Sequence, residues 1–248
     1  MTLYVFSDLH IQSQNDPMYR SFCDVLSGKP SPGDYVVLAG DIFDLFVGDK
    51  KAFLDRYSEF FLILENLMNQ KVRVDYIEGN HDFQLDQVLK RYGVHHHDAE
   101  VEINLEGKKF YIAHGDLIDE EDRGYRLLRG IFRSKIFSQM VKLAPGAWID
   151  QIGQTSSKVS RKYNPMQINL RVRGLFRDFA LTKFHQNFDY IVLGHCHDLD
   201  ETVVDLGGRQ GQYINMGFPK VHGFFLSWKP GEILVKREQL PIGKLQHS

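Results

Sequence analysis

The sequence predicts an α/β fold in which two packed mixed sheets carry helices on their outer faces. Residues 1–77 alternate continuous apolar runs with amphipathic helical segments, an order that favours a parallel sheet with buried strands. From residue 101 onward, short strands joined by turns indicate a second sheet. The length of 248 residues fits one large domain or a domain with an insertion.

The N-terminal part contains three strand-like runs and two helical segments. The runs are continuously apolar, whereas the helical segments space their apolar residues three or four positions apart. Gly28 and Pro30 follow the first helical segment and are residues that end helices. The predicted strands are Leu3–Ser7, Tyr35–Ala39 and Val72–Ile77, and the predicted helices are Asp16–Leu26 and Lys51–Asn69.

The C-terminal part is expected to supply the second sheet. Glu106-Gly107-Lys108 separates two strand-like runs and indicates a hairpin. A long helical stretch follows this hairpin. Before the hairpin, we expect His95-His96-His97 to lie in a surface turn. The predicted strands are Val101–Leu105, Lys109–Ala113, Tyr190–Leu193, Thr202–Asp205, Gln212–Asn215, Phe224–Trp228 and Ile233–Lys236.

The composition excludes several functional classes. A net charge of −2 and a pI near 6.6 do not indicate nucleic-acid binding. Cys23 and Cys196 lie far apart in the sequence and imply no disulfide framework, which favours a reducing cytoplasm. The opening residues lack the features of a signal peptide, and no apolar run approaches the roughly 20 residues that span a bilayer. We expect a protein that is soluble or bound to a membrane surface, with no obligate protein partner.

Five polar segments each follow an apolar run and offer oxygen or imidazole donors. Since open α/β sheets place their sites at the carboxyl ends of strands, we expect these donors to converge. Any one segment alone would be weak evidence, because Gly-Asp and Gly-Asn are common in turns. The segments are Asp8-Leu9-His10, Gly40-Asp41-Ile42-Phe43-Asp44, Gly79-Asn80-His81-Asp82, His114-Gly115-Asp116 and Gly194-His195-Cys196-His197.

The spacing and chemistry of the donors indicate a metal site. The alternation in Asp8-x-His10 and His195-x-His197 would place both donors on one side of an extended segment. Asp41, with two carboxylate oxygens, is the best candidate to bridge two ions. Mixed nitrogen and oxygen donors suit Mn²⁺, Fe, Zn²⁺ or Mg²⁺, and the absence of thiolates argues against structural zinc.

In order and spacing, these segments resemble the calcineurin-like metallophosphoesterase superfamily over residues 8–197. The resemblance implies a four-layer αββα sandwich and two divalent metal ions, for which we expect Mn²⁺. Two such ions can activate water and neutralise phosphoryl oxygens. We expect His81 to act as a general acid or to stabilise charge, with Asp82 orienting it. The implied ligands are Asp8, His10, Asp41 and His197 for one ion, and Asp41, Asn80, His114 and His195 for the other.

The stretch from Arg123 to Arg177 is strongly basic, with 12 Lys or Arg residues and the single acid Asp150. It carries +11, so the rest of the chain carries −13. Its many apolar residues follow helical spacing. Three interpretations remain open: a packed helix with a solvated basic face, a lid over an anionic and partly apolar substrate, or a surface that docks on anionic lipid.

The lid interpretation is similar to the organisation of the UDP-2,3-diacylglucosamine pyrophosphohydrolases of the lipid A pathway. Gly115-Asp116 and the residues up to Arg129 resemble that family's lid entry, and Ser157 to Lys162 resemble its lid exit. The resemblance implies one domain over residues 1–248 with a helical lid insertion at about 118–178. The implied substrate-binding residues are Asn80, His81, Asp122, Tyr125, Arg129, Ser157, Lys158, Lys162 and His195.

His81 is a departure, because the best-known branch of that family has arginine at this position. Arginine stabilises charge but cannot donate a proton near neutral pH. We expect cleavage of UDP-2,3-diacylglucosamine to UMP and a lipid-sugar 1-phosphate, at the inner face of the cytoplasmic membrane. Because His81 can donate a proton, an alternative function remains open. The protein would then be a phosphodiesterase or phosphatase that acts on a soluble nucleotide or another phosphoester. A non-catalytic scaffold fits less well, because every donor position is filled.

Overall fold

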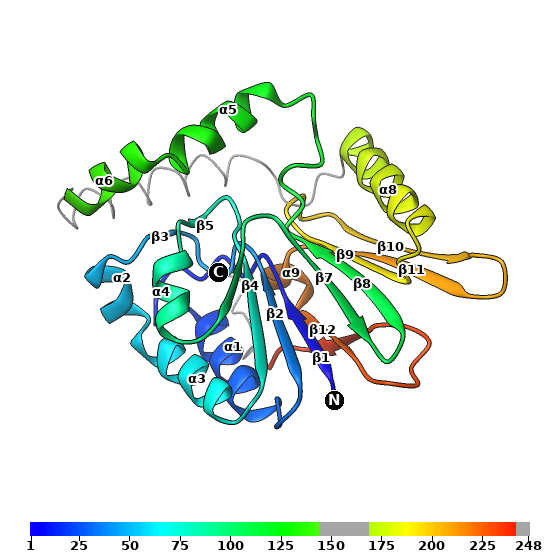
Figure 1. The fold of residues 1–248 in the computed structure, drawn as a ribbon, viewed down its shortest axis with the longest axis horizontal. Helices are drawn as coiled ribbons and strands as arrows, with labels where there is room; N and C mark the ends of the chain where they lie inside the picture. Colours follow the sequence, from blue (N-terminus) through cyan, green and yellow to red (C-terminus); the bar gives the residue numbers. More distant parts are fainter. Residues whose placement is uncertain (144–168, 242–248) are drawn as a thin grey trace.

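The fold is that of a computed structural model, which describes residues 1–143 and 169–241 (Figure 1). Two mixed sheets pack face to face, and the prediction of an α/β sandwich is confirmed. Ser157, Lys158 and Lys162, which were predicted to bind substrate, lie outside the described residues. No helix among the described residues is long and apolar enough to cross a membrane.

The first sheet is built around four parallel strands, of which β1 and β2 are central, with two antiparallel strands at one edge. Its order is β13 (Lys236–Gln239), β12 (Phe224–Trp228), β1 (Leu3–Phe6), β2 (Tyr35–Ala39), β4 (Arg73–Ile77) and β6 (His95–His97). A separate parallel pair, β3 (Phe46–Val47) and β5 (Asp82–Phe83), was not predicted.

The second sheet has three parallel central strands and an antiparallel strand at each edge. Its order is β10 (Leu199–Asp205), β11 (Gln210–Met216), β9 (Tyr190–Leu193), β8 (Lys108–Ala113) and β7 (Glu100–Leu105). The described helices are α1 (Pro17–Gly28), α2 (Lys51–Arg56), α3 (Ser58–Asn69), α4 (Asp86–Arg91), α5 (Arg123–Phe132), α6 (Lys135–Leu143), α8 (Leu170–His185) and α9 (Pro219–His222).

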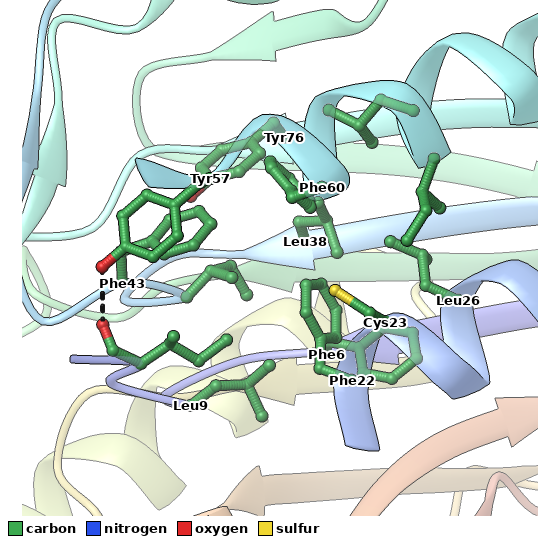
Figure 2. Packing of buried hydrophobic residues seen from close by; sticks show 14 of the residues in the cluster. Phe6, Leu9, Phe22, Cys23, Leu26, Leu38, Phe43, Tyr57, Phe60 and Tyr76 are labelled. Carbon is green, nitrogen blue, oxygen red and sulfur yellow. Dashed lines mark hydrogen bonds between the residues drawn. The ribbon is translucent and has the colours of Figure 1, made fainter. Parts of the chain in front are cut away.

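Three buried apolar clusters define four layers. Val37 and Val192 belong to the cluster between the two sheets. Phe22 and Phe60 belong to the cluster between the first sheet and the helices α1 and α3 (Figure 2). Phe176 of α8 belongs to the cluster on the outer face of the second sheet. This arrangement is the expected αββα sandwich, with α5 and α6 lying over β3 and β5 (Figure 1).

The predicted helix Lys51–Asn69 is wrong in one respect, because it is divided into α2 and α3 at Tyr57. Tyr57 has φ −114° and ψ 30°, outside the helical range. Its ring packs against Phe43 at 4.2 Å between centroids, and its hydroxyl lies 3.4 Å from the carbonyl oxygen of Ile11 (Figure 2). The break therefore serves a tertiary contact that helical spacing does not reveal.

Two further predictions are wrong. His95-His96-His97 forms the edge strand β6 instead of a turn, because its backbone pairs with β4 and two of its imidazoles contact buried carboxylates. His96 lies 3.0 Å from Glu78, and His97 lies 2.5 Å from Asp75. The last strand runs over Lys236–Gln239 instead of Ile233–Lys236, since its register is set by pairing with β12.

Candidate metal centre

The five polar segments meet at the carboxyl ends of parallel strands from both sheets. Asp8 follows β1, Asp41 follows β2 and Asn80 follows β4 in the first sheet. His114 follows β8 and His195 follows β9 in the second sheet. The structure thus brings together the residues that the sequence predicted as metal ligands, as the general rule for strand ends implies.

One group of donors comprises Asp8, His10 and His197, whose ligand atoms lie within 4.8 Å of one another. His10 Nε2 is 3.0 Å from His197 Nε2, and His197 Nε2 is 3.4 Å from Asp8 Oδ1. Two imidazole nitrogens and a carboxylate that converge in this way form a set of donors suited to a divalent transition metal.

A second group comprises Asn80, His114 and His195. The Asn80 side-chain oxygen is 3.0 Å from His114 Nε2 and 3.0 Å from His195 Nδ1. Asp41 lies between the two groups, because its Oδ2 is 3.6 Å from His10 Nε2 and 3.5 Å from His114 Nε2. The position of Asp41 fits the bridging role expected for it.

The donor segments are not extended, contrary to the expectation for Asp8-x-His10 and His195-x-His197. Their φ angles are 55° at Asp8, 46° at His10, 69° at His195 and 54° at His197, and Asp41 has 53°. Left-handed backbone is uncommon for residues other than glycine and costs about 1–3 kcal/mol per residue in the less populated regions. Such strain at five of the seven candidate ligands indicates that the surrounding fold imposes their geometry.

The glycines that precede the donors are required by close approach. A Cβ atom on Gly79 would lie 2.1 Å from Asp41 Oδ1, and one on Gly194 would lie 2.2 Å from Asp8 Oδ2. A Cβ atom on Gly40 would lie 2.7 Å from the His114 ring. These distances are far below van der Waals contact, so a larger residue would push the donors apart.

Burial controls the protonation of the donors. Burial lowers the pKa of His10 and of His195 to about 4, which keeps both imidazoles neutral and able to bind metal at pH 7. Burial raises the pKa of Asp41 well above its ordinary value, helped by the nearby Asp82 and Asp8 and opposed by His81. Burial also acts to raise the pKa of Asp8, but its contact with His197 and the neighbouring imidazoles lower it overall. Buried carboxylates with neutral imidazoles fit divalent cations, which would supply the missing positive charge.

His81 is oriented by Asp44, not by Asp82 as predicted. His81 Nδ1 lies 2.9 Å from the Asp44 carbonyl oxygen, which can only accept a hydrogen bond. The proton of a neutral His81 therefore sits on Nδ1, and Nε2 is the nitrogen left for a substrate or a second proton. The His81 ring also meets the His10 ring edge to face at 4.8 Å between centroids, which places it beside the first donor group.

Asp82 is buried and holds backbone in place. Its carboxylate accepts the N–H groups of Asp41 at 2.9 Å and of Gly79 at 2.9 Å, and the Tyr76 hydroxyl at 2.6 Å. It therefore ties the loop that carries Asp41 to the loop that carries Asn80. The carboxylate is occupied by these donors, which is the physical reason that it does not orient the His81 ring.

The described residues of the predicted lid entry contact one another. Asp122 caps α5 by accepting the N–H of Tyr125 at 2.8 Å. The Tyr125 hydroxyl donates to Asp116, and Arg129 Nε donates to the same carboxylate at 2.8 Å. The Tyr125 ring lies 6.1 Å from the His195 ring, so the start of α5 is close to the second donor group.

Part of the positive charge of residues 123–177 is paired with acids that follow the His195-x-His197 segment. Arg173 donates to both carboxylate oxygens of Asp198, the residue after His197, at 2.6 and 2.5 Å. Arg177 pairs with Asp200 in the same bidentate manner, at 2.8 and 2.6 Å. The excess of +11 in residues 123–177 therefore overstates the charge available to an anionic partner.

Two residues that support the first donor group were not predicted. The Phe218 ring stacks on the His197 ring at 4.7 Å, with 16° between the planes. Lys220 donates to the backbone carbonyl of His10 at 2.7 Å. Phe218 directly follows Gly217 and Lys220 lies three positions after it. Gly217 ends a Tyr-x-Asn-x-Gly pattern that begins in β11, and this pattern is the local signal that could have drawn attention to the two residues.

Comparison with known proteins yields matches along most of the chain. A family model described as calcineurin-like phosphoesterase matches residues 1–199. The UDP-2,3-diacylglucosamine hydrolase of Psychromonas ingrahamii is 26% identical over 218 residues, covering 87% of this chain and 88% of that protein. The protein of the same name from Haemophilus ducreyi is 25% identical over 232 residues, covering 93% of each chain.

Similarity among solved structures is more distant. The structure of a novel archaeal phosphodiesterase aligns with 97% of this chain and 100% of its own, at 15% identity and a TM-score of 0.47. A match at this level adds no argument about fold or function.

Proposed function

This chain belongs to the calcineurin-like phosphoesterase family, and we propose that it cleaves the pyrophosphate bond of UDP-2,3-diacylglucosamine. As a member of that family it is a metal-dependent phosphoester hydrolase. The observation that carries the proposed substrate is the match to UDP-2,3-diacylglucosamine hydrolases over 87–93% of this chain. The products would be UMP and a lipid-sugar 1-phosphate.

The donor groups support the use of two divalent ions, with Mn²⁺ proposed as the native metal. Asp8, His10 and His197 would hold one ion, Asn80, His114 and His195 the other, and Asp41 would contact both. When bound, such ions neutralise phosphoryl oxygens and activate water for in-line attack.

The protein groups would contribute orientation and charge. The Asp44 carbonyl fixes the His81 ring, so that Nε2 can carry a proton or stabilise negative charge on the leaving phosphate. Pyrophosphate cleavage expels a phosphate monoester, which needs little help from an acid. His81 can therefore replace the arginine of the best-known branch without loss of the reaction class.

Helices α5 and α6 are proposed as the described part of a lid. They expose apolar side chains, including Leu127 at 69%, Ile136 at 74% and Met140 at 63% of the accessible area. These side chains would contact the acyl chains of the substrate at the inner membrane surface. Tyr125 and Arg129 would face its polar part from the start of α5, near His195.

The test is hydrolysis of UDP-diacylglucosamine by metal-depleted protein to which Mn²⁺ is returned, with bis-p-nitrophenyl phosphate as a small diester control. Metal-dependent release of UMP, well above turnover of the diester, is the expected result. Turnover of the diester alone would contradict the lipid substrate. It would support the second candidate, a phosphodiesterase for soluble nucleotides, which His81 favours because an alkoxide leaving group needs a proton donor.

A further inference from the structure

We propose that Arg133 positions Asn80 for one of the two metal ions and so connects α5 to the metal centre. The inference rests on the proposed two-metal site, but it concerns a residue outside the predicted ligands and substrate contacts. Arg133 directly follows α5 and is partly buried. Its guanidinium reaches the segment that leads from β4 into Asn80.

The guanidinium of Arg133 makes two directed contacts there. Nε donates to Glu78 Oε2 at 3.0 Å, and Nη2 donates to the Gly79 carbonyl oxygen at 3.0 Å. That carbonyl belongs to the planar peptide group that continues into Asn80. Holding the oxygen therefore fixes the plane that ends at the Asn80 Cα atom and restricts the directions open to the Asn80 side chain.

Glu78 is a rigid partner for Arg133. It is 2% exposed, and its Oε1 accepts the Leu85 N–H at 2.7 Å and His96 Nε2 at 3.0 Å. Its other oxygen, Oε2, forms a partly buried ion pair with Arg133. A buried charge with this many partners fixes the guanidinium in one place.

Further contacts keep the end of α5 in register with the same segment. The Gln84 side-chain amide donates to the Phe132 carbonyl at 2.7 Å. The Phe83 and Phe132 rings stack at 5.8 Å, with 11° between the planes. The hydrogen bond and the ring contact hold the end of α5 against Phe83 and Gln84, and so keep Arg133 beside Glu78 and Gly79.

A second arginine extends the link to another ligand of the same group. Arg129 lies one helical turn before Arg133 and donates to Asp116, two residues after His114. The two arginines therefore contact the loops that present Asn80 and His114. The Asp8, His10 and His197 group has different supports, Phe218 and Lys220. Loss of Arg133 should weaken one metal position selectively.

The experiment is calorimetric titration of metal-depleted protein with Mn²⁺. Arg133→Met keeps the apolar stem and removes the guanidinium, and Arg126→Met removes the same charge from an exposed position of α5. In Arg133→Met, one of the two binding steps should weaken by about 10- to 100-fold, the usual effect of removing a group that orients a ligand. The other step, and both steps in Arg126→Met, should keep the affinity of the unaltered protein.

Two backgrounds identify the affected position. In Asn80→Ala, which removes the ligand that Arg133 orients, adding Arg133→Met should change the remaining affinity less than twofold. In His10→Ala, the same addition should weaken the remaining site about tenfold or more. Arg133→Lys keeps the positive charge but lacks the paired Nε and Nη2 donors of the guanidinium. It should recover only part of the Mn²⁺ affinity that Arg133→Met loses.

Two results would overturn the inference. One is an Arg133→Met protein that binds both ions as the unaltered protein does. The other is equal weakening of both steps together with a lower melting temperature of the metal-free protein, which would show a general structural role. The titration needs no organic substrate, so failure to release UMP would count against the proposed substrate and leave the assignment of Arg133 intact.

Discussion

Asp41 and Asp82 each anchor the backbone of the other's loop. The Asp82 carboxylate accepts the N–H of Asp41 at 2.9 Å, and the Asp41 carboxylate accepts the N–H of His81, the neighbour of Asp82, at 2.9 Å. The two loops that follow β2 and β4 are therefore joined by a reciprocal pair of hydrogen bonds with ionisable acceptors. The two carboxylates have different roles. Asp41 is itself a candidate metal ligand, whereas Asp82 holds the backbone of the loops that carry the ligands.

Asp82→Asn should destabilise the protein by roughly 1–3 kcal/mol, because an amide cannot accept all of the N–H donors that the carboxylate satisfies. The expected change is a lower midpoint of urea unfolding for the metal-free protein, with weaker Mn²⁺ binding. Asp86→Asn is the matched control, since the Asp86 side chain is 70% exposed. An Asp82→Asn protein as stable as this control would contradict a structural role for the carboxylate.

Asp41→Asn should lower metal-dependent activity by more than about 100-fold while the fold is kept, because Asp41 lies next to both donor groups. Circular dichroism and the rate of diester hydrolysis with Mn²⁺ measure the two effects. The metal-free variant should also melt at a higher temperature than the metal-free parent at pH 7, since it no longer buries a carboxylate whose pKa is raised by burial. Retained activity would contradict the bridging position of Asp41.

Gly79→Ala should abolish metal binding, because the added Cβ would lie 2.1 Å from Asp41 Oδ1. Gly174→Ala in α8 is the matched control, with no atom within 4 Å of the added Cβ. The control should be neutral or stabilised by about 0.5–1 kcal/mol, as expected for alanine in a helix. Mn²⁺ titration and thermal unfolding of both variants test the difference, and normal Mn²⁺ affinity in Gly79→Ala would show that the loops can move apart.

Asp75→Asn should lower stability at pH 7 by roughly 1–3 kcal/mol, an effect that fades as the pH falls toward 4 and below. Burial acts to raise the pKa of Asp75, but hydrogen bonds from His97, Tyr35 and Arg73 lower it overall. A depressed pKa stabilises the folded state above the pKa of the unfolded chain, near 3.9, and this stabilisation is lost as the pH falls through the folded pKa. Urea unfolding of both proteins from pH 7 down to about pH 2 measures the difference in stability, and a difference that stays constant as the pH falls below about 4 would contradict this explanation.

Replacing Leu127, Ile136 and Met140 by serine should raise KM for the acylated substrate by about tenfold or more, since burying one such side chain contributes about 1.5–3 kcal/mol. Hydrolysis of bis-p-nitrophenyl phosphate should change less than twofold. Leu62→Ser, at a 59% exposed position of α3, controls for loss of exposed apolar area. Equal losses on both substrates would argue that α5 and α6 serve only to stabilise the structure.

Several strands could be predicted from the sequence because each is a continuous apolar run that is buried along its length. Tyr35–Ala39, Tyr190–Leu193 and Phe224–Trp228 have the bounds that apolarity alone indicated. The helix break at Tyr57 and the strand His95–His97 could not be predicted. Each depends on a partner distant in sequence, Ile11 for Tyr57 and Asp75 for His97.

The candidate ligands could be identified because glycine, acid, amide and histidine residues follow strand ends in a fixed order. The roles of the residues around them required three-dimensional contacts. Asp82 sits next to His81 in the sequence, yet its carboxylate turns to the N–H groups of Asp41 and Gly79. Arg133 and Glu78 are 55 residues apart and carry no shared motif.

The sequence by itself determined the layer order, the candidate donor set and the hydrolase family, because burial pattern and residue chemistry are local properties. Only the tertiary structure decided which backbone angles the donors adopt, which carboxylate orients which group, and how the arginines of the insertion are paired. Those features depend on charges and hydrogen-bond donors that come from distant strands and helices. The packing of the two sheets and of α5 determines which charges and hydrogen-bond donors meet. No single segment of the sequence encodes that packing.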